Sequence, residues 1–279
     1  MSRRNLRLIV AVAAAVVPVT LQAHRQWMLP SSTVLSNADS WITVDAAVSN
    51  ELFYFDHVPM RLSNLVITGP DGAVVTPENA ATGKYRSTFD VHLTQPGTYR
   101  IAQVNDTIFA TWTENGERKN WRGSAAEFAK VVPANAEGMK KSRMSNRVEV
   151  FVTAGKPTKR ALEPSGVGLE LAPVTHPNDL VTGEAATFQL LMNGKPAAGM
   201  EITLIPGGIR YRDELHEMKC KTEQDGKFTF TFEDPGMYWL NATSGGGPRM
   251  GGPGGGQGPM RFPEGDRASY TATLEVLPQ

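Results

Sequence analysis

The sequence has very little cysteine: Cys220 is the single one among 279 residues. One cysteine cannot form an intramolecular disulfide, so the fold must be held together by packing. It also excludes the paired-cysteine motifs that bind zinc or exchange disulfides. Cys220 stands between Lys219 and Lys221, whose charges could lower the pKa of its thiol, but within a strand it would pack as a small hydrophobe.

Neither sign of charge is in excess, because 28 lysines and arginines face 28 acidic residues. This balance gives no reason to expect nucleic acid or an anionic membrane as a partner. Enzyme signatures are also missing: there is no Gly-x-Ser-x-Gly elbow, phosphate-binding loop or dinucleotide fingerprint, and Gly207-Gly208 is too short for any of them. Asp213-Glu214 could act as paired carboxylates, although adjacent acids are usually solvated. We therefore expect a protein that is not an enzyme.

Long apolar runs are absent except at the start of the chain. Three arginines precede the apolar stretch Leu8–Val19, which is interrupted by Pro18 and followed by Leu21-Gln22-Ala23. A membrane-spanning helix needs about 20 apolar residues, so a cleaved signal peptide is favoured over a membrane anchor. We predict that residues 1–23 are removed after Ala23, that His24 becomes the amino terminus, and that the protein is exported to the periplasm. The mature chain would carry a net charge near −3, since the segment contains three arginines and no acidic residue.

The rest of the chain is typical of short strands separated by turns. Trp41–Val48 alternates between apolar and polar residues, and Lys227–Phe232 places three phenylalanines on one side of a strand. Gln95-Pro96-Gly97-Thr98-Tyr99 and Asp234-Pro235-Gly236-Met237-Tyr238 look like one turn used twice. Regularly spaced strands in two blocks predict an all-β fold of two tandem immunoglobulin-like β-sandwich domains.

The expected boundaries follow changes in composition. We predict an N-terminal sandwich over 24–155, a linker over 156–167 and a C-terminal sandwich over 168–279. Residues 124–144, rich in Ala, Glu, Lys and Met, predict one or two short helices around Pro133 or a polar excursion between strands. The glycine-rich segment 245–265 predicts a flexible loop, in which Met250 and Met260 could be soft metal ligands.

His24 is the most informative residue for function. At a mature amino terminus, one histidine offers both the α-amino group and the imidazole Nδ1, which together chelate ions such as Cu(II) or Ni(II). The α-amino pKa is about 8, so its deprotonation costs little near neutral pH. A second imidazole would complete a three-nitrogen site. The alternative is that cleavage simply leaves a histidine there. The amino-terminal motif with histidine in third place is absent, since Gln26 occupies that position.

Four other histidines could supply the second imidazole. His57 follows the aromatic segment Phe53-Tyr54-Phe55 and a carboxylate, and it is the preferred partner of His24. His92 is expected on the solvent face of a strand, and His176 precedes a Pro-Asn-Asp turn near the domain junction. His216 lies in a charged segment. No His-x-His or His-Glu-x-x-His spacing distinguishes any of them from an ordinary histidine.

The junction Ala23-His24, followed by Trp27 and Leu29-Pro30, resembles a bacterial domain-of-unknown-function family. Its members are often labelled as periplasmic components of nickel or cobalt uptake (NikM/NikK-like). The segments 171–177 and 193–199 fit the same family, and the similarity covers nearly the whole mature chain. The resemblance implies a metal site that includes His24 and His176, which matches the family's Thr-His-Pro turn. It departs from the family at Arg25, where an acidic or small residue is usual.

These observations lead to one main hypothesis and two alternatives. The main hypothesis is a periplasmic binding protein for a divalent transition metal (Ni, Co or Cu), with His24, His57 and His176 as candidate ligands and an inner-membrane metal transporter as a partner. The second is an interaction module for protein or glycan without metal, whose aromatics would cluster on an exposed face: Phe53, Tyr54, Phe55, Trp112 and Trp121. The third is a copper oxygenase with a histidine brace.

Overall fold

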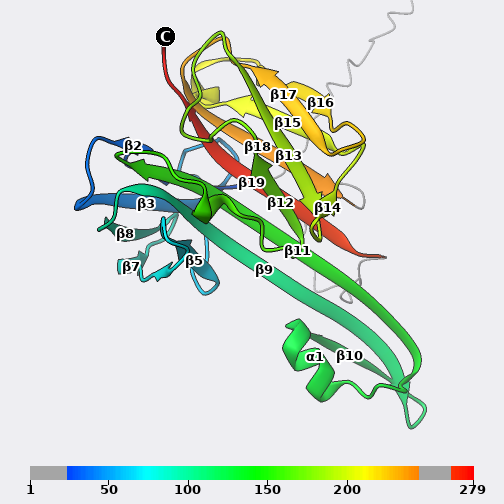
Figure 1. Ribbon diagram of the computed structural model, residues 1–279. Helices are drawn as coiled ribbons and strands as arrows, with labels where there is room; N and C mark the ends of the chain where they lie inside the picture. The colour runs from blue at the N-terminus through cyan, green and yellow to red at the C-terminus, as the bar shows by residue number, and fades with distance from the viewer. Residues whose placement is uncertain (1–23, 245–264) are drawn as a thin grey trace, which may run out of the picture.

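The computed structural model describes residues 24–244 and 265–279 (Figure 1). The predicted signal peptide and all but the last residue of the glycine-rich segment 245–265, with Met250 and Met260, therefore lie outside the described residues. The strands before the predicted linker are β1 (Arg25–Pro30), β2 (Val34–Leu35), β3 (Ser40–Ser49), β4 (Val58–Pro59), β5 (Leu65–Thr68), β6 (Val74–Val75), β7 (Glu78–Thr82), β8 (Ser87–Leu93), β9 (Gly97–Glu114), β10 (Glu117–Gly123) and β11 (Glu137–Ala154).

The strands of the second half are β12 (Leu169–Pro173), β13 (Ala185–Met192), β14 (Lys195–Pro196), β15 (Glu201–Pro206), β16 (Met218–Lys221), β17 (Lys227–Thr231), β18 (Gly236–Ser244) and β19 (Arg267–Val276). Helical structure in the described residues is limited to α1 (Ala125–Val131) and two 3₁₀ turns, η1 (Arg160–Leu162) and η2 (Ile209–Tyr211). No helix among the described residues is long and apolar enough to span a membrane.

Two β-sandwiches share one large sheet, whose strand order is β16-β15-β18-β19-β11-β9-β5-β6. A sheet of β1, β3, β8 and β7 packs on its β5–β9–β11 part, around a core that includes Ile42, Phe89 and Val150. A sheet of β12, β13, β14 and β17 packs on its β15–β18–β19 part, around Phe188 and Tyr270. The predicted all-β fold of two sandwiches is confirmed.

Strand β11 is the point where the two halves join. It pairs antiparallel with β9 along most of its length and parallel with β19 from Met144 to Val150. Since β9 precedes the predicted linker and β19 follows it, the halves are connected by continuous hydrogen bonding as well as by the segment 156–167. In Figure 1, β9, β11 and β19 run side by side through the middle of the molecule.

Each sandwich contains the same hydrogen-bonded corner. The Tyr99 hydroxyl donates to the carbonyl of Gln95 at 2.9 Å, and the Tyr238 hydroxyl donates to the carbonyl of Asp234 at 2.7 Å. A tyrosine bonded to the backbone a few residues upstream is the tyrosine corner of immunoglobulin-like sandwiches. Both corners contain a glycine, Gly97 at φ +136° and Gly236 at φ +137°. The repeated Pro-Gly-x-Tyr turn therefore builds equivalent corners, which supports the immunoglobulin-like description.

Beyond the sandwiches, β9 and β11 continue into an arm that also carries β10 and α1 (Figure 1). Ser124 caps α1 through a reciprocal bond with Glu127, and Pro133 follows the last turn, so the helix is short. From Glu137 onward the chain is extended because it pairs with β9. The helix expected near 124–144 therefore occupies only the beginning of that segment.

Polar and apolar residues alternate along the strands of the large sheet. On β18 and β19, core residues such as Leu240 and Tyr270 face the second sandwich, while Asn241, Thr243 and Thr271 face the other way. The same face carries Val148 and Val150 of β11, which are buried in the first sandwich. The two smaller sheets thus cover opposite faces of the large sheet, and part of the polar face of β15, β18 and β19 is left open.

Candidate amino-terminal metal site

His24 immediately precedes β1, and pairing between β1 and β3 places Arg25 opposite Ser49 at the end of β3. The chain after β3 turns back through residues 50–56. The Asp56 carboxylate holds this turn by accepting hydrogen bonds from the backbone N–H groups of Asn50 (2.9 Å) and Glu51 (3.1 Å). His57 follows directly and is thereby brought back to the start of β1.

The His24 and His57 rings are stacked, with centroids 3.8 Å apart and ring planes 2° from parallel. Within the described residues neither ring makes a hydrogen bond, and both are partly exposed. The structure therefore brings together the two histidines that the sequence analysis paired, and leaves their nitrogens uncommitted.

The two stacked imidazoles do not yet direct their nitrogens toward one metal ion, but a small movement would bring them into position. The nitrogen lone pairs of an imidazole lie in the ring plane, so two parallel rings direct them side by side rather than toward one point. A rotation of one ring about its side-chain bonds would make the lone pairs converge. Among the described residues, no group of three or more His, Cys, Asp or Glu side chains could hold a metal. If cleavage occurs after Ala23 as predicted, the α-amino group of His24 would supply a third nitrogen at this place.

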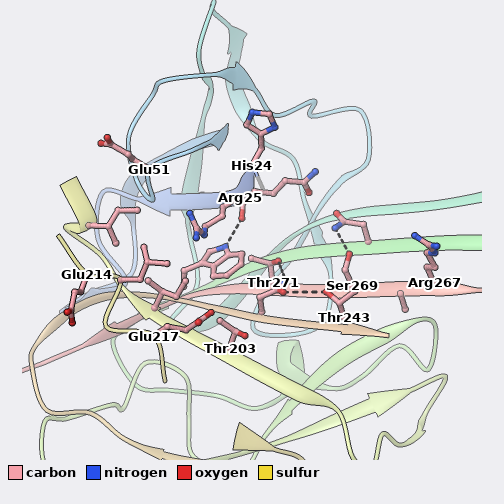
Figure 2. A pocket seen from close by; sticks show the side chains of 18 of the residues that line it. His24, Arg25, Glu51, Thr203, Glu214, Glu217, Thr243, Arg267, Ser269 and Thr271 are labelled. Atoms are coloured by element: carbon pink, nitrogen blue, oxygen red, sulfur yellow. Dashed lines mark hydrogen bonds between the residues drawn. The ribbon is translucent and has the colours of Figure 1, made fainter. Parts of the chain in front are cut away.

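A cleft of about 820 Å³ begins at His24 and extends over the open polar face of the large sheet (Figure 2). Its floor consists of hydroxyl and amide side chains from four strands: Asn146, Thr203, Asn241, Thr243, Ser269 and Thr271. Several of these bond to one another, as when Asn146 donates to the Ser269 hydroxyl at 2.8 Å and Asn241 donates to the Thr271 hydroxyl at 3.1 Å. Trp239 closes one wall and donates its indole N–H to the carbonyl of Gln26.

Charged side chains divide the cleft into two ends. Glu51, Glu214 and Glu217 lie at one end in Figure 2 and Arg267 lies at the other, with Thr243, Ser269 and Thr271 between them. Asp213 adds a further carboxylate to the lining. Glu51 pairs with Arg210 at 3.7 Å and Glu217 pairs with Lys219 at 3.0 Å, so part of this negative charge is neutralised within the protein.

Two of the three lining arginines are committed to the protein itself. Arg212 donates to the backbone carbonyls of Pro206, Gly207 and Glu214 at 2.5 to 2.9 Å, and burial lowers its pKa. Arg25 donates to the carbonyl of Asn50 and lies 5.8 Å from the centre of the Trp239 ring. Burial also lowers the pKa of Arg25, and Glu217 partly offsets this effect. The positive charge of Arg25 is therefore directed toward Trp239 and away from the His24 ring (Figure 2).

His176 lies elsewhere, at the junction of the two halves. Its Nδ1 accepts a hydrogen bond from the backbone N–H of Asn178 at 3.2 Å, so that nitrogen carries no proton. Nε2 therefore carries the proton and donates to the Thr98 hydroxyl at 2.9 Å. Burial lowers the pKa of His176, which favours the neutral ring. Both nitrogens are occupied, and the structure does not bring His176 to His24 and His57.

The remaining residues considered from the sequence have ordinary surroundings. His92 stacks on Trp41 and contacts the Asp39 carboxylate at 2.8 Å, while His216 is exposed. Cys220 packs against the core of the second sandwich, and burial raises the pKa of its thiol to about 11, so the flanking lysines do not activate it.

The aromatic residues of the interaction-module alternative do not gather on one exposed face. Phe53 and Phe55 pack against the buried Trp27, and Trp121 packs on Phe128 of α1. Trp112 is buried in the same cluster of the arm as Trp121. Of these five aromatic residues, only Tyr54 contacts a strongly exposed ring among the described residues. That ring belongs to Tyr211.

Sequence reasoning did not find the cleft or the acidic residues Glu51 and Glu217. The alternation of Asn241 and Thr243 with core residues was a usable signal, but such a pattern is the same on any solvated strand face. The lining comes from segments far apart in the chain, and only the fold shows that they meet.

The chain belongs to the family described as Domain of unknown function (DUF4198), whose model matches residues 21–246. No curated protein matches the sequence. Among solved structures, the D0-D1 domain of Intimin is 12% identical with a TM-score of 0.22, covering 90% of this chain and 97% of that chain. The human OSCAR ligand-binding domain is 12% identical with a TM-score of 0.21, covering 91% and 99%. Likeness at these scores carries no argument about fold or function.

Proposed function

We propose that the chain is an exported periplasmic protein that binds a divalent transition metal and passes it to an envelope transporter. The metal is Ni(II), Co(II) or Cu(II), and the protein is not an enzyme. The observation that carries the proposal is the stacking of His24 on His57 at the predicted mature amino terminus. Cleavage after Ala23 would add an α-amino nitrogen to two imidazoles that are already adjacent.

The ligand types favour late transition metals. Amine and imidazole nitrogens suit Ni(II), Cu(II), Co(II) and Zn(II), whereas Mg(II) and Ca(II) prefer oxygen ligands. For a given nitrogen site affinity generally rises from Co(II) through Ni(II) to Cu(II). Geometry and availability, rather than raw affinity, would then select the physiological metal.

The role of a carrier agrees with the position of the site. His24 and His57 are partly exposed, and the ligands lie at the end of a strand and in a short loop rather than in a core. A metal held there can be reached by another protein, as transfer to a transporter requires. The resemblance to NikM/NikK-like chains noted in the sequence implies the same role.

The test is calorimetric titration of periplasmically processed protein with Ni(II), Co(II) and Cu(II). We expect one ion per chain, with affinity reduced at least 100-fold in His24→Ala and at least tenfold in His57→Ala. His92→Ala is the matched control, since His92 is a partly exposed, stacked histidine on the same sandwich. It should bind as the wild type does. Equal binding by all four proteins, or none by the wild type, would refute the proposal.

A further inference from the structure

The floor of the cleft is arranged as two rows of hydroxyl and amide side chains that cross neighbouring strands. The pairing register places Thr203, Asn241 and Thr271 in the first row, and Thr243, Ser269 and Asn146 in the second. Residues two positions apart on a strand face the same side, so the rows are about 7 Å apart. The cleft volume of about 820 Å³ lies in the range of pockets that enclose small organic molecules, about 300 to 1,000 Å³.

The two rows lie between an apolar wall and a guanidinium group. Trp239 is two residues before Asn241 on β18 and lines the cleft together with Leu215. Arg267 is two residues before Ser269 on β19 and lies at the other end (Figure 2). Trp239 pairs with Thr273, six residues from Arg267 on β19, so the lined surface is about 20 Å long.

Three buried polar atoms of the cleft lining have no hydrogen-bond partner among the described residues. They are the side-chain carbonyl oxygens of Gln26 and Asn146, and the Nε–H of Arg267. Buried polar atoms normally have a partner, and each exception requires an explanation. Two of these atoms need a donor and one needs an acceptor. A hydroxyl group both donates and accepts, so a ligand rich in hydroxyls would satisfy all three after small rotations of the side-chain ends.

The charges of the lining do not favour an ionic ligand. Glu51 pairs with Arg210 at 3.7 Å and Glu217 pairs with Lys219 at 3.0 Å, and the other two carboxylates of the lining are exposed to solvent. Neither row contains a charged side chain. An anion would use Arg267 and leave most of the floor without a partner, and an apolar ligand would leave all of it so.

We propose that the cleft binds a short neutral oligosaccharide that lies along the floor from Trp239 to Arg267. The sugar hydroxyls exchange hydrogen bonds with the two rows, and Arg267 donates to sugar oxygens. The C–H face of one sugar ring packs on Trp239. Binding requires no metal, so this site is separate from the proposed metal site.

Affinity at such a site comes from several hydrogen bonds acting together. Each bond to a sugar hydroxyl replaces a bond to water, so its net contribution is modest. Loss of a single neutral hydroxyl such as that of Thr203 should therefore weaken binding only a few-fold. Loss of the Arg267 guanidinium removes several N–H donors at once and should have the larger effect.

The test is calorimetric titration of metal-free protein that begins at His24, in the presence of EDTA. The probes are maltotriose, cellotriose and tri-N-acetylchitotriose, each raised to about 10 mM, at which a Kd of about 1 mM is measurable. We expect at least one of them to bind once per chain. Arg267→Met should weaken that binding about tenfold and Thr203→Val about threefold. Arg118→Met and Thr231→Val change exposed residues outside the cleft and should bind as the wild type does.

Circular dichroism of each variant shows whether its fold is unchanged. Absence of binding by all three trisaccharides would overturn the proposal, as would equal affinity in Arg267→Met and the wild type. Binding of triglycine, a peptide of similar length, in place of all three sugars would overturn it in favour of a peptide site. None of these results affects the Ni(II) titration, so failure of the saccharide site and failure of the metal site are distinguishable.

Discussion

At the scale of single residues, hydrogen-bond partners decide what each histidine can do. His176 uses both ring nitrogens in bonds to Thr98 and Asn178, whereas His24 and His57 contact each other and keep their nitrogens available. The candidate ligands in the sequence therefore separate into one histidine held by hydrogen bonds and a stacked pair whose nitrogens have no partner among the described residues. The distinction depends on neighbours that no local motif around His176 reveals.

The buried His176 should make stability depend on pH. Burial lowers its pKa in the folded protein below the usual histidine value of about 6.5. As pH falls below about 6.5, the unfolded chain therefore binds a proton that the folded protein does not. Stability should therefore decrease from pH 7 toward pH 5. In urea titrations across this range, His176→Gln should lose less stability on acidification than the wild type, although it is less stable at pH 7. Parallel pH profiles for the two proteins would contradict this explanation.

At the scale of elements, the turn between β3 and β4 positions His57. Asp56→Ala would remove the acceptor of two backbone N–H groups, which costs about 1 to 2 kcal/mol and releases the turn. We expect the affinity for Ni(II), measured by calorimetry, to fall about tenfold. Asp39→Ala removes a carboxylate that contacts a different histidine, His92, and should leave the affinity unchanged. Wild-type affinity in Asp56→Ala would show that the turn does not position the ligand.

Local patterns predicted most of the elements but not how they combine. Phe228, Phe230 and Phe232 are buried as their alternation predicts, and the two Pro-Gly-x-Tyr turns form equivalent corners. The parallel pairing of β11 with β19 joins residues that are more than 100 positions apart, so no window of the sequence contains it. His57 was identified because it follows a strand near a carboxylate, while the cleft required the complete fold.

At the scale of the whole molecule, a buried charged cluster holds the two halves together. Arg147 of β11 contacts Glu149 at 2.9 Å and Glu170 of β12 at 3.2 Å, and the Tyr270 hydroxyl of β19 donates to Glu149 at 2.8 Å. Burial alone would lower the pKa of Arg147, but the two carboxylates outweigh it and the pKa is raised. The cluster connects strands from both sides of the predicted linker.

Removing the arginine should therefore weaken the whole molecule. Arg147→Met leaves two buried carboxylates without their cation, for which we expect a loss of about 3 to 5 kcal/mol in the free energy of unfolding. Arg143→Met breaks the more exposed pair with Asp106 and should cost about 1 kcal/mol or less. Urea denaturation monitored by tryptophan fluorescence measures both. Similar losses in the two variants would mean that the buried cluster does not join the halves as described.

The central claim is that the free amine of His24 binds the metal, and one comparison tests this claim directly. Protein that begins at His24 and protein that keeps one additional alanine before it differ only in whether the His24 nitrogen is a free amine. Titration of both with Ni(II) should show tight binding by the first and at least 100-fold weaker binding by the second, with identical folds by circular dichroism. Equal affinity in the two proteins would contradict the amino-terminal site.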